Sequence, residues 1–301
     1  MGQKLRHMRA KRISVVVLAA LVLAAVITWL CFLPRTPQYG GKTLSEWLIM
    51  LDPDVDHATD HEKASEALRH IGKAALPELG RILHSRPSPL REYVRGYAVR
   101  WHLMKPAKLS FQDWEFRAAR AAYHLAEDAD LSLAGFVPDL RFHLTNSSYA
   151  ETEMARALAR AGPEGIACLT NLLAHGERRV RGQAARALAL DRGVRSQPGA
   201  QDALIQSATS DPDPFIRANA LIFLSSFQQG AATNRLVSLG LQSLKSDDGY
   251  TRWAATLLLQ NYLSIPDVAA AFPGLASDPD ERVRSAAAKA LEGRRTEASP
   301  K

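Results

Sequence analysis

Cysteine and aromatic residues are scarce in this chain of 301 residues. Its two cysteines stand in different settings, Cys31 in a long apolar run and Cys168 in a segment of helical periodicity. Two such cysteines cannot form the disulfide framework of a small secreted domain. Aromatic residues make up 7% of the chain although 47% of it is hydrophobic, so the apolar content consists mainly of small aliphatic side chains. That composition favours closely packed helices over a core built around large rings.

Acidic residues are absent from residues 1–35, and this absence decides how the net charge of +7 is interpreted. Six of the 38 basic residues lie in that segment, which leaves 32 basic and 31 acidic residues for the rest of the chain. The rest is therefore nearly neutral. Since nucleic-acid binding needs a concentrated basic surface, we expect no nucleic-acid partner.

Residues 13–33 form an uncharged apolar run of 21 residues, ISVVVLAALVLAAVITWLCFL. A helix of that length is roughly 30 Å long and could cross a bilayer. The run lacks the small-x-small end of a cleavable signal, which favours a transmembrane anchor over a cleaved signal peptide. Five basic residues in segment 1–12 precede the run, so the N-terminus is expected in the cytoplasm. The body is then expected outside it, in the periplasm of a Gram-negative cell, although cleavage and the opposite orientation stay open.

The segment after the apolar run predicts a short linker followed by helices. Residues 34–42, PRTPQYGGK, are rich in Pro and Gly and are assigned to the linker. Thr43 and Glu46 have the spacing of a capping box, which predicts a helix start. No stretch shows the alternation typical of strands, and apolar-periodic segments alternate with turns rich in Asp, Pro and Gly. We therefore expect an all-helical body over residues 43–293 and a disordered tail over 294–301.

A helical segment recurs through the second half of the chain. Its clearest copies are ERRVRGQAARAL (177–188), DPFIRANALIFL (213–224), DGYTRWAATLLL (248–259) and DERVRSAAAKAL (280–291). The β-branched positions of these copies are 36, 35 and 32 residues apart, as in solenoids built from helix pairs. Weaker copies and their partner helices extend the pattern toward residue 61, for about seven or eight pairs. Each strong copy carries an arginine that could reach an Asp of a neighbouring repeat, and we assign these four a structural role: Arg181, Arg217, Arg252 and Arg284.

This pattern resembles HEAT repeats, in particular the HEAT-like repeats described around phycobilisome lyases. The resemblance covers roughly residues 61–292, and with the preceding apolar run the layout is similar to that of membrane-anchored bacterial HEAT-repeat proteins. It implies a right-handed α-α superhelix of the HEAT or armadillo-like kind, preceded by one transmembrane helix. It implies fold more firmly than function.

Metal binding or catalysis has one candidate location, the acidic and histidine-containing stretch Asp52–Glu62. His57 and His61 are four residues apart and could face one metal together with Asp60. The stretch does not fit an EF-hand loop, because His57 takes the place of the turn glycine. A solvated loop between helices is the more common role for such a stretch. We therefore expect no cofactor, no metal and no enzyme, with a metal-binding or enzymatic HEAT-like protein as the alternative.

Two groups of residues are candidates for partner binding. Tyr93, Tyr97 and Trp101 recur every four residues on a basic segment, where core packing is the more common role and partner contact the alternative. The same expectation of core packing applies to Trp253 and Tyr262. The second group is Arg178, Arg179 and Arg186 on one strong repeat, which we assign to a partner surface.

A helical solenoid offers an extended concave face lined by successive second helices, and such faces bind peptides or domains. The sequence therefore predicts a membrane-anchored scaffold or adaptor for protein partners. The partner, its pathway and the oligomeric state stay open.

Overall fold

The computed structural model describes the larger part of the chain after the apolar run. The described residues are 36–51, 58–86, 93–94, 97, 99–101, 111–126, 131–147, 150–191, 194, 198–227 and 232–297. The predicted basic segment 1–12 and the predicted transmembrane helix 13–33 lie outside these residues. Among the helices that are described, none has the length and apolar character needed to cross a membrane.

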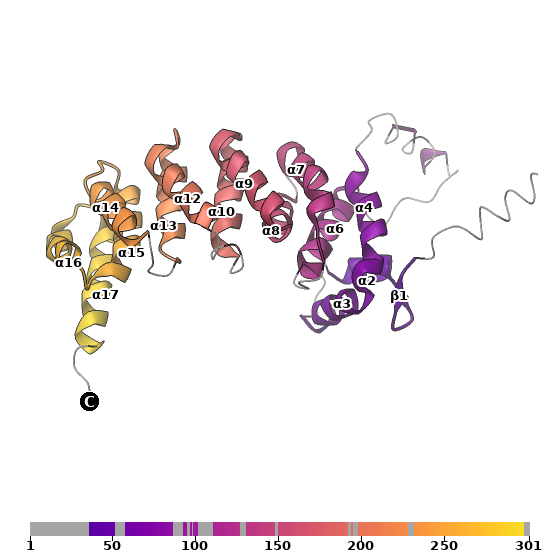
Figure 1. Ribbon diagram of the computed structural model, residues 1–301, viewed down its shortest axis with the longest axis horizontal. Helices are drawn as coiled ribbons and strands as arrows, with labels where there is room; N and C mark the ends of the chain where they lie inside the picture. Colours follow the sequence, from indigo (N-terminus) through magenta and orange to yellow (C-terminus); the bar gives the residue numbers. More distant parts are fainter. Residues whose placement is uncertain are drawn as a thin grey trace, which may run out of the picture.

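The described part of the chain is a row of paired helices in two layers (Figure 1). The row starts with the pair α2 (Leu44–Met50) and α3 (Ala58–Ile71). The first layer then contains α4 (Leu76–His84), α7 (Val137–Asn146), α9 (Pro163–His175), α12 (Pro198–Ser210), α14 (Thr233–Ser243) and α16 (Pro266–Ala271). The second layer contains α6 (Phe111–Leu125), α8 (Glu151–Arg160), α10 (Arg178–Leu190), α13 (Pro214–Leu224), α15 (Gly249–Leu259) and α17 (Glu281–Glu297). Neighbours within each layer contact one another in sequence order, which is the arrangement of a helical repeat solenoid.

Short 3₁₀ turns connect several of these helices. They are η1 (Gly72–Ala75), η2 (Ala134–Phe136), η3 (Gln260–Tyr262) and η4 (Phe272–Ser277). The final helix α17 extends to Glu297, so residues 294–297 are helical where the sequence predicted the start of a disordered tail.

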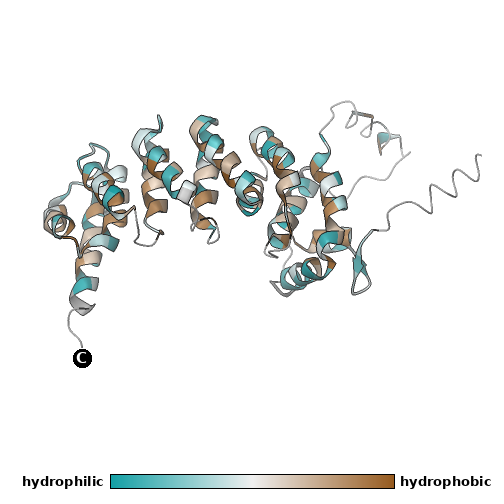
Figure 2. Ribbon diagram, viewed as in Figure 1, coloured by the Kyte–Doolittle hydropathy of each residue, from teal (hydrophilic) through white to brown (hydrophobic). Residues whose placement is uncertain are grey.

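Small side chains let the helices approach closely, as the sequence predicted. On α10, Ala184, Ala185 and Ala187 are buried, and Val180 and Leu188 fill the space beside them. Gly240 on α14 shows how tight the contact is, because a Cβ atom there would lie 2.7 Å from the side chain of Leu259 on α15. Figure 2 shows hydrophobic and hydrophilic residues alternating along each helix, as expected where one side of a helix is buried.

The segment predicted as a linker contains a small β-hairpin. Strands β1 (Gln38–Tyr39) and β2 (Lys42–Thr43) pair antiparallel, with Tyr39 opposite Lys42. Gly40 and Gly41 join them with φ values of 56° and 77°, which suit a two-residue type I′ turn. The helix α2 begins directly after β2, and its predicted capping box is confirmed: the Thr43 amide donates to Glu46 Oε2 at 2.7 Å.

The turns that lead into α13, α15 and α17 share one hydrogen-bonded design. In the turn before α13, Asp211 accepts the amide of Asp213 at 2.9 Å, and Asp213 caps the helix by accepting the amide of Phe215 at 2.9 Å. The turn before α17 repeats this, with Asp278 accepting the amide of Asp280 at 2.8 Å. Because these turns are alike, α13, α15 and α17 start at equivalent points of their repeats.

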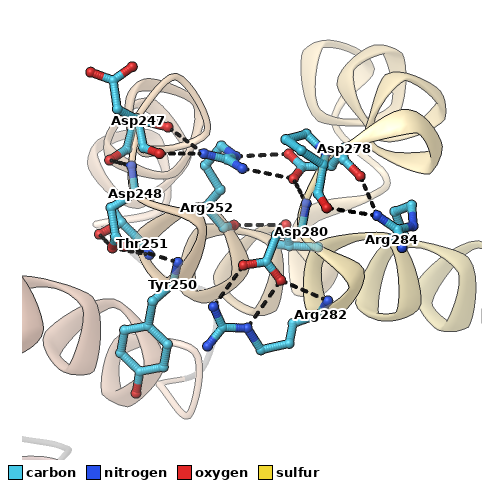
Figure 3. A network of polar contacts seen from close by, with 12 residues as sticks. Asp247, Asp248, Tyr250, Thr251, Arg252, Asp278, Asp280, Arg282 and Arg284 are labelled. Carbon is cyan, nitrogen blue, oxygen red and sulfur yellow. Dashed lines mark hydrogen bonds and ion pairs between the residues drawn. The ribbon is translucent and has the colours of Figure 1, made fainter.

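Two of the four predicted structural arginines cross to the next repeat. Arg181 Nε and Nη2 donate to both carboxylate oxygens of Asp211, at 2.8 and 2.9 Å. Arg252 does the same to Asp278, also at 2.8 and 2.9 Å (Figure 3). The Arg252 and Asp278 side chains are only 13% and 8% exposed, so this bidentate ion pair is largely shielded from solvent.

The other two arginines bond within their own turns. Arg217 Nη1 donates to the backbone carbonyl of Asp211 at 2.7 Å, and Arg284 Nη1 donates to that of Asp278 at 2.7 Å. Among the described residues no carboxylate of the next repeat pairs with Arg217, because Ser246 stands at the position that Asp211 and Asp278 occupy in their turns. Ser246 still accepts the amide of Asp248, at 3.2 Å, so it keeps the turn but not the ion pair.

We predict that Arg252→Ala destabilises the solenoid more than Arg217→Ala. Loss of Arg252 leaves the buried Asp278 carboxylate without its cation, which costs about 3 kcal/mol. Loss of Arg217 removes a hydrogen bond to a carbonyl, which costs about 1 kcal/mol. Urea unfolding of the full chain in detergent, followed by tryptophan fluorescence, measures the difference.

Ser246→Asp is the converse variant, because it places a carboxylate where Arg217 can reach it. We expect Ser246→Asp to unfold at a higher urea concentration than the unaltered protein. In the Arg217→Ala background, Ser246→Asp should not raise the urea midpoint. Equal destabilisation by Arg217→Ala and Arg252→Ala would contradict the assigned difference.

The same turns predict an acid-labile solenoid. The hydrogen bonds from Arg252 hold the pKa of Asp278 below its usual range, and those from Arg282 lower the pKa of Asp280 to about 2. The Thr251 hydroxyl likewise lowers the pKa of Asp248. A carboxyl group whose pKa is lower in the folded state stabilises the fold above its unfolded pKa, and that stability is lost as pH falls. We expect the melting temperature to fall between about pH 4 and about pH 2.

The variant Asp278→Asn should melt at a lower temperature near neutral pH and lose less on acidification. Asp202→Asn is the control, since Asp202 pairs with Arg235 at the surface, where both side chains are 58% exposed. A pH dependence that is unchanged in Asp278→Asn would refute the role of this carboxylate.

Candidate functional site

The exposed side of the second-layer helices carries a continuous groove. Its larger part, about 860 Å³, lies between α10 and α13 and is lined by Glu177, Arg178, Arg179, Gly182, Gln183, Arg186, Phe215, Ile216, Asn219 and Phe223. A smaller hollow of about 190 Å³ lies between α6, α8 and α10 and is lined by Tyr123, Thr152, Ala155, Arg156, Gln183, Arg186, Ala187, Leu190 and Asp191. Gln183 and Arg186 line both parts. We call the two parts together the second-helix groove.

Aromatic rings extend the floor of the groove toward α15. Phe215 and Tyr250 stack, with ring centroids 5.6 Å apart and planes 10° apart, and Trp253 lies 5.3 Å beyond Tyr250. The Tyr250 hydroxyl donates to Asn219 Oδ1 at 2.9 Å. Burial raises the pKa of the Tyr250 phenol, so its hydroxyl stays protonated and keeps donating. Phe215 remains 50% exposed, which leaves an aromatic face open to a bound molecule.

Arginines lie over these rings. The Arg178 guanidinium is 5.8 Å from the centroid of Phe215, and that of Arg282 is 5.4 Å from the centroid of Tyr250. In the smaller hollow, the Arg156 guanidinium is 4.0 Å from the centroid of Tyr123. The groove therefore combines aromatic surface with positive charge, a combination common at protein interfaces.

All three arginines assigned to a partner surface line the groove, but they differ in what else they bind. Arg178 pairs with Asp213. Arg179 donates to the carbonyls of Thr145 and Ser147 at 3.2 and 3.1 Å, and it also pairs with Glu151. Arg186 is exposed, and within the described part of the chain it has neither an ion pair nor a side-chain hydrogen bond. Arg186 is therefore the cation that a partner can recruit without breaking a contact of the fold.

The sequence did not identify the aromatic lining of the groove. Trp253, expected in the core, is half-buried beside Tyr250, whereas Tyr262 is buried as expected. A usable signal was present: Arg179, Phe215, Tyr250 and Arg282 each stand two residues before an arginine of the repeated segment. Equivalent starts place these four side chains along one edge of the second layer.

The aromatic residues Tyr93, Tyr97 and Trp101 do not line the groove. They belong to the stretch between α4 and α6, and they are 66%, 52% and 67% exposed. The expectation of core packing is therefore wrong for all three. Their spacing indicated a common face but not whether another element covers that face.

The described residues do not form the metal site considered from the sequence. Asp60 and His61 lie in α3, so that end of the Asp52–Glu62 stretch is helical, not an interhelical loop. His61 packs edge-on against His124, with ring centroids 5.4 Å apart, and burial lowers the pKa of His61. His57 lies outside the described residues. Among those described, no group of three His, Cys, Asp or Glu side chains could hold a metal ion.

We predict that Arg179→Ala destabilises the fold and that Arg186→Ala does not. Arg179 satisfies carbonyls at the C-terminal end of α7, and its loss costs about 2 kcal/mol. Arg186→Ala should change the free energy of unfolding by no more than about 0.5 kcal/mol. Urea unfolding of both variants measures this, and a destabilising Arg186→Ala would show that Arg186 is structural.

The comparison with family models agrees with the repeat architecture. A family model described as HEAT repeats matches residues 143–225, 166–241 and 237–301, together more than half of the chain. No curated protein matches. Among solved structures, the chain is similar to two crystal structures of engineered proteins from the Northeast Structural Genomics Consortium. One is 24% identical over 85% of this chain and 68% of the other, with a TM-score of 0.40. The second is 20% identical over 84% of this chain and 96% of the other, with a TM-score of 0.41. On the evidence of the family match and the stacked helix pairs, the chain belongs to the HEAT-repeat family.

Proposed function

We propose that this protein is a membrane-anchored scaffold that holds a protein partner in its second-helix groove. HEAT repeats generally mediate protein–protein interaction, and solenoids of this kind are typically not enzymes. The observation that carries the proposal is the groove itself, an open, aromatic and basic surface that crosses several repeats.

The groove has the features of a recognition surface for an extended segment. Its parts follow one another along α6, α8, α10 and α13, so an occupant would contact several repeats in succession. Phe215 offers exposed aromatic surface, and Arg186 offers a positive charge that no ion pair among the described residues uses. Aromatic and arginine side chains are the most frequent contributors of binding energy at protein interfaces. An extended segment with acidic and apolar side chains fits this lining best.

The anchor is supported by the sequence of the N-terminal segment. Residues 13–33 are long and apolar enough to span a bilayer, and the basic residues in 1–12 favour a cytoplasmic N-terminus. The solenoid would then face the extracytoplasmic side. The near neutrality of the body supports a protein partner over a nucleic acid.

We predict that a photo-crosslinking amino acid at Phe215 captures a partner in native membranes that the same amino acid at Gln206 does not. Gln206 is the matched control because it is exposed on α12, in the first layer. Arg186→Glu should weaken capture at position 215 at least about fivefold, as expected for loss of about 1 kcal/mol of charge-assisted binding.

Equal capture at positions 206 and 215, or capture unaffected by Arg186→Glu, would refute the groove as the binding surface. The same cells test the orientation: protease added to intact spheroplasts should digest the solenoid. A protected solenoid would place it in the cytoplasm.

A further inference from the structure

Exposed large apolar and aromatic side chains gather at one end of the described solenoid. Six of the eight belong to the N-terminal hairpin, to α2 or to the stretch between α4 and α6: Tyr39, Ile49, Tyr93, Val94, Tyr97 and Trp101. The other two are Leu190 and Phe215, which line the second-helix groove. The clustering at the N-terminal end is unrelated to the groove and needs its own explanation.

Three of these side chains have the spacing of one helical face. Tyr93, Tyr97 and Trp101 are four residues apart, and the Trp101 amide donates to the Tyr97 carbonyl at 3.0 Å, as in a helical turn. The rings of Tyr93 and Tyr97 have centroids 5.5 Å apart. Val94 beside them is 57% exposed. We call Tyr93, Tyr97 and Trp101 the aromatic stripe.

The chain reaches the solenoid at this same end. The described structure starts at Thr36, only three residues after Leu33, the last residue of the apolar run. Three extended residues span about 10 Å, so a bilayer that holds residues 13–33 lies within about that distance of Thr36. In Figure 1 the hairpin strand β1 and the described piece between α4 and α6 both lie at the end of the row where the chain begins. The aromatic stripe therefore lies at the same end of the row as the point where the chain enters it.

The sequence around the stripe has the chemistry of a membrane interface. Residues 87–110 contain five basic residues, Arg91, Arg95, Arg100, Lys105 and Lys108, and a single acidic one, Glu92. Tyrosine and tryptophan are enriched where lipid headgroups meet acyl chains, because their rings combine apolar surface with a polar tip. Basic residues add attraction to anionic headgroups of about 1 kcal/mol each.

We propose that the aromatic stripe inserts into the lipid interface beside the transmembrane helix and gives the solenoid a second attachment to the bilayer. The inference rests on the membrane anchor of the proposed function. The solenoid then stands with its N-terminal end on the membrane and its row of repeats leading away. The helices α10 and α13 lie in the middle of the row (Figure 1), so the groove between them would stay open to a partner.

Tryptophan quenching in bilayers tests the aromatic stripe. The full chain has five tryptophans, including Trp29 in the apolar run and Trp101 in the stripe. It is reconstituted in nanodiscs of phosphatidylcholine and phosphatidylglycerol, with the phosphatidylcholine dibrominated near the top of its acyl chains. The measured quantity is the tryptophan emission that is lost when the lipid is brominated. If Trp29 and Trp101 are the two residues that bromine reaches, Trp101→Phe lowers this loss to about half.

Trp253→Phe is the matched control, because Trp253 lies on α15, far along the row, and its removal should leave the quenched emission unchanged. Trp101 is exposed, so Trp101→Phe should fold normally, as circular dichroism can verify. The double variant Tyr93→Ser with Tyr97→Ser keeps Trp101 and should reduce its quenching. Replacing Arg95 and Arg100 by Glu should do the same, because the anionic headgroups would repel the segment.

The outcomes separate the two proposals. Quenching that disappears in Trp29→Phe and is unchanged in Trp101→Phe keeps the anchor and overturns the aromatic stripe as a lipid contact. Absence of all bromine quenching overturns the anchor and, with it, the stripe. Trp101 that is shielded from aqueous iodide but not quenched by bromine would mean that a protein covers the stripe, which also overturns the lipid assignment.

Discussion

The structure depends on one constraint: a helix pair of this chain cannot cover its own apolar side, so each pair must be fixed against the next in a defined orientation. The turns before α13 and α17 do this. Asp211 and Asp278 each accept a backbone amide of their own turn and the guanidinium of the preceding repeat, Arg181 or Arg252. The same carboxylate therefore closes its own turn and forms an ion pair with the preceding repeat. Because the arginine and aspartate side chains are largely withdrawn from water, this bidentate ion pair is directional and specifies the orientation of adjacent repeats.

The groove follows from the same turns. Since Asp213, Asp248 and Asp280 cap their helices at equivalent positions, the residue two places before each repeated arginine falls on the same edge of the second layer. That edge is where Phe215 stacks on Tyr250. Side chains at these positions are held in line by the helix starts, and two of them also contact the preceding repeat. Arg179 donates to carbonyls at the end of α7, and Tyr250 stacks on Phe215. The same edge therefore contributes both to the packing of the repeats and to the lining of the groove.

The repeats were predictable from the sequence because their core residues recur with the period of a helix and their turns recur with the period of a repeat. The difference between Arg252 and Arg217 was not apparent in the arginines, which look equivalent, and depends on Ser246 in the following turn. The hairpin at Gln38–Thr43 was missed because strands of two residues have no periodicity to detect. The spacing of Tyr93, Tyr97 and Trp101 predicted a shared face, but only the spatial arrangement shows that this face is open. The groove lining could not be predicted without the spatial arrangement either, since Phe215 and Asn219 come from one helix and Tyr250 from another.

The two ends of the described solenoid differ in a way that fits an anchored scaffold. The family match covers residues 143–301, where the repeats are regular, whereas the N-terminal end carries a hairpin and the stretch between α4 and α6. A regular repeat can be fixed by its neighbours, but the first repeat has a neighbour on one side only and must cover its other side differently. A solvent-exposed aromatic stripe at this end does not solve that problem in water. Against a bilayer it would, because the interface would take up the rings, and the anchor that we propose for residues 13–33 would supply the proximity that makes so small a contact effective.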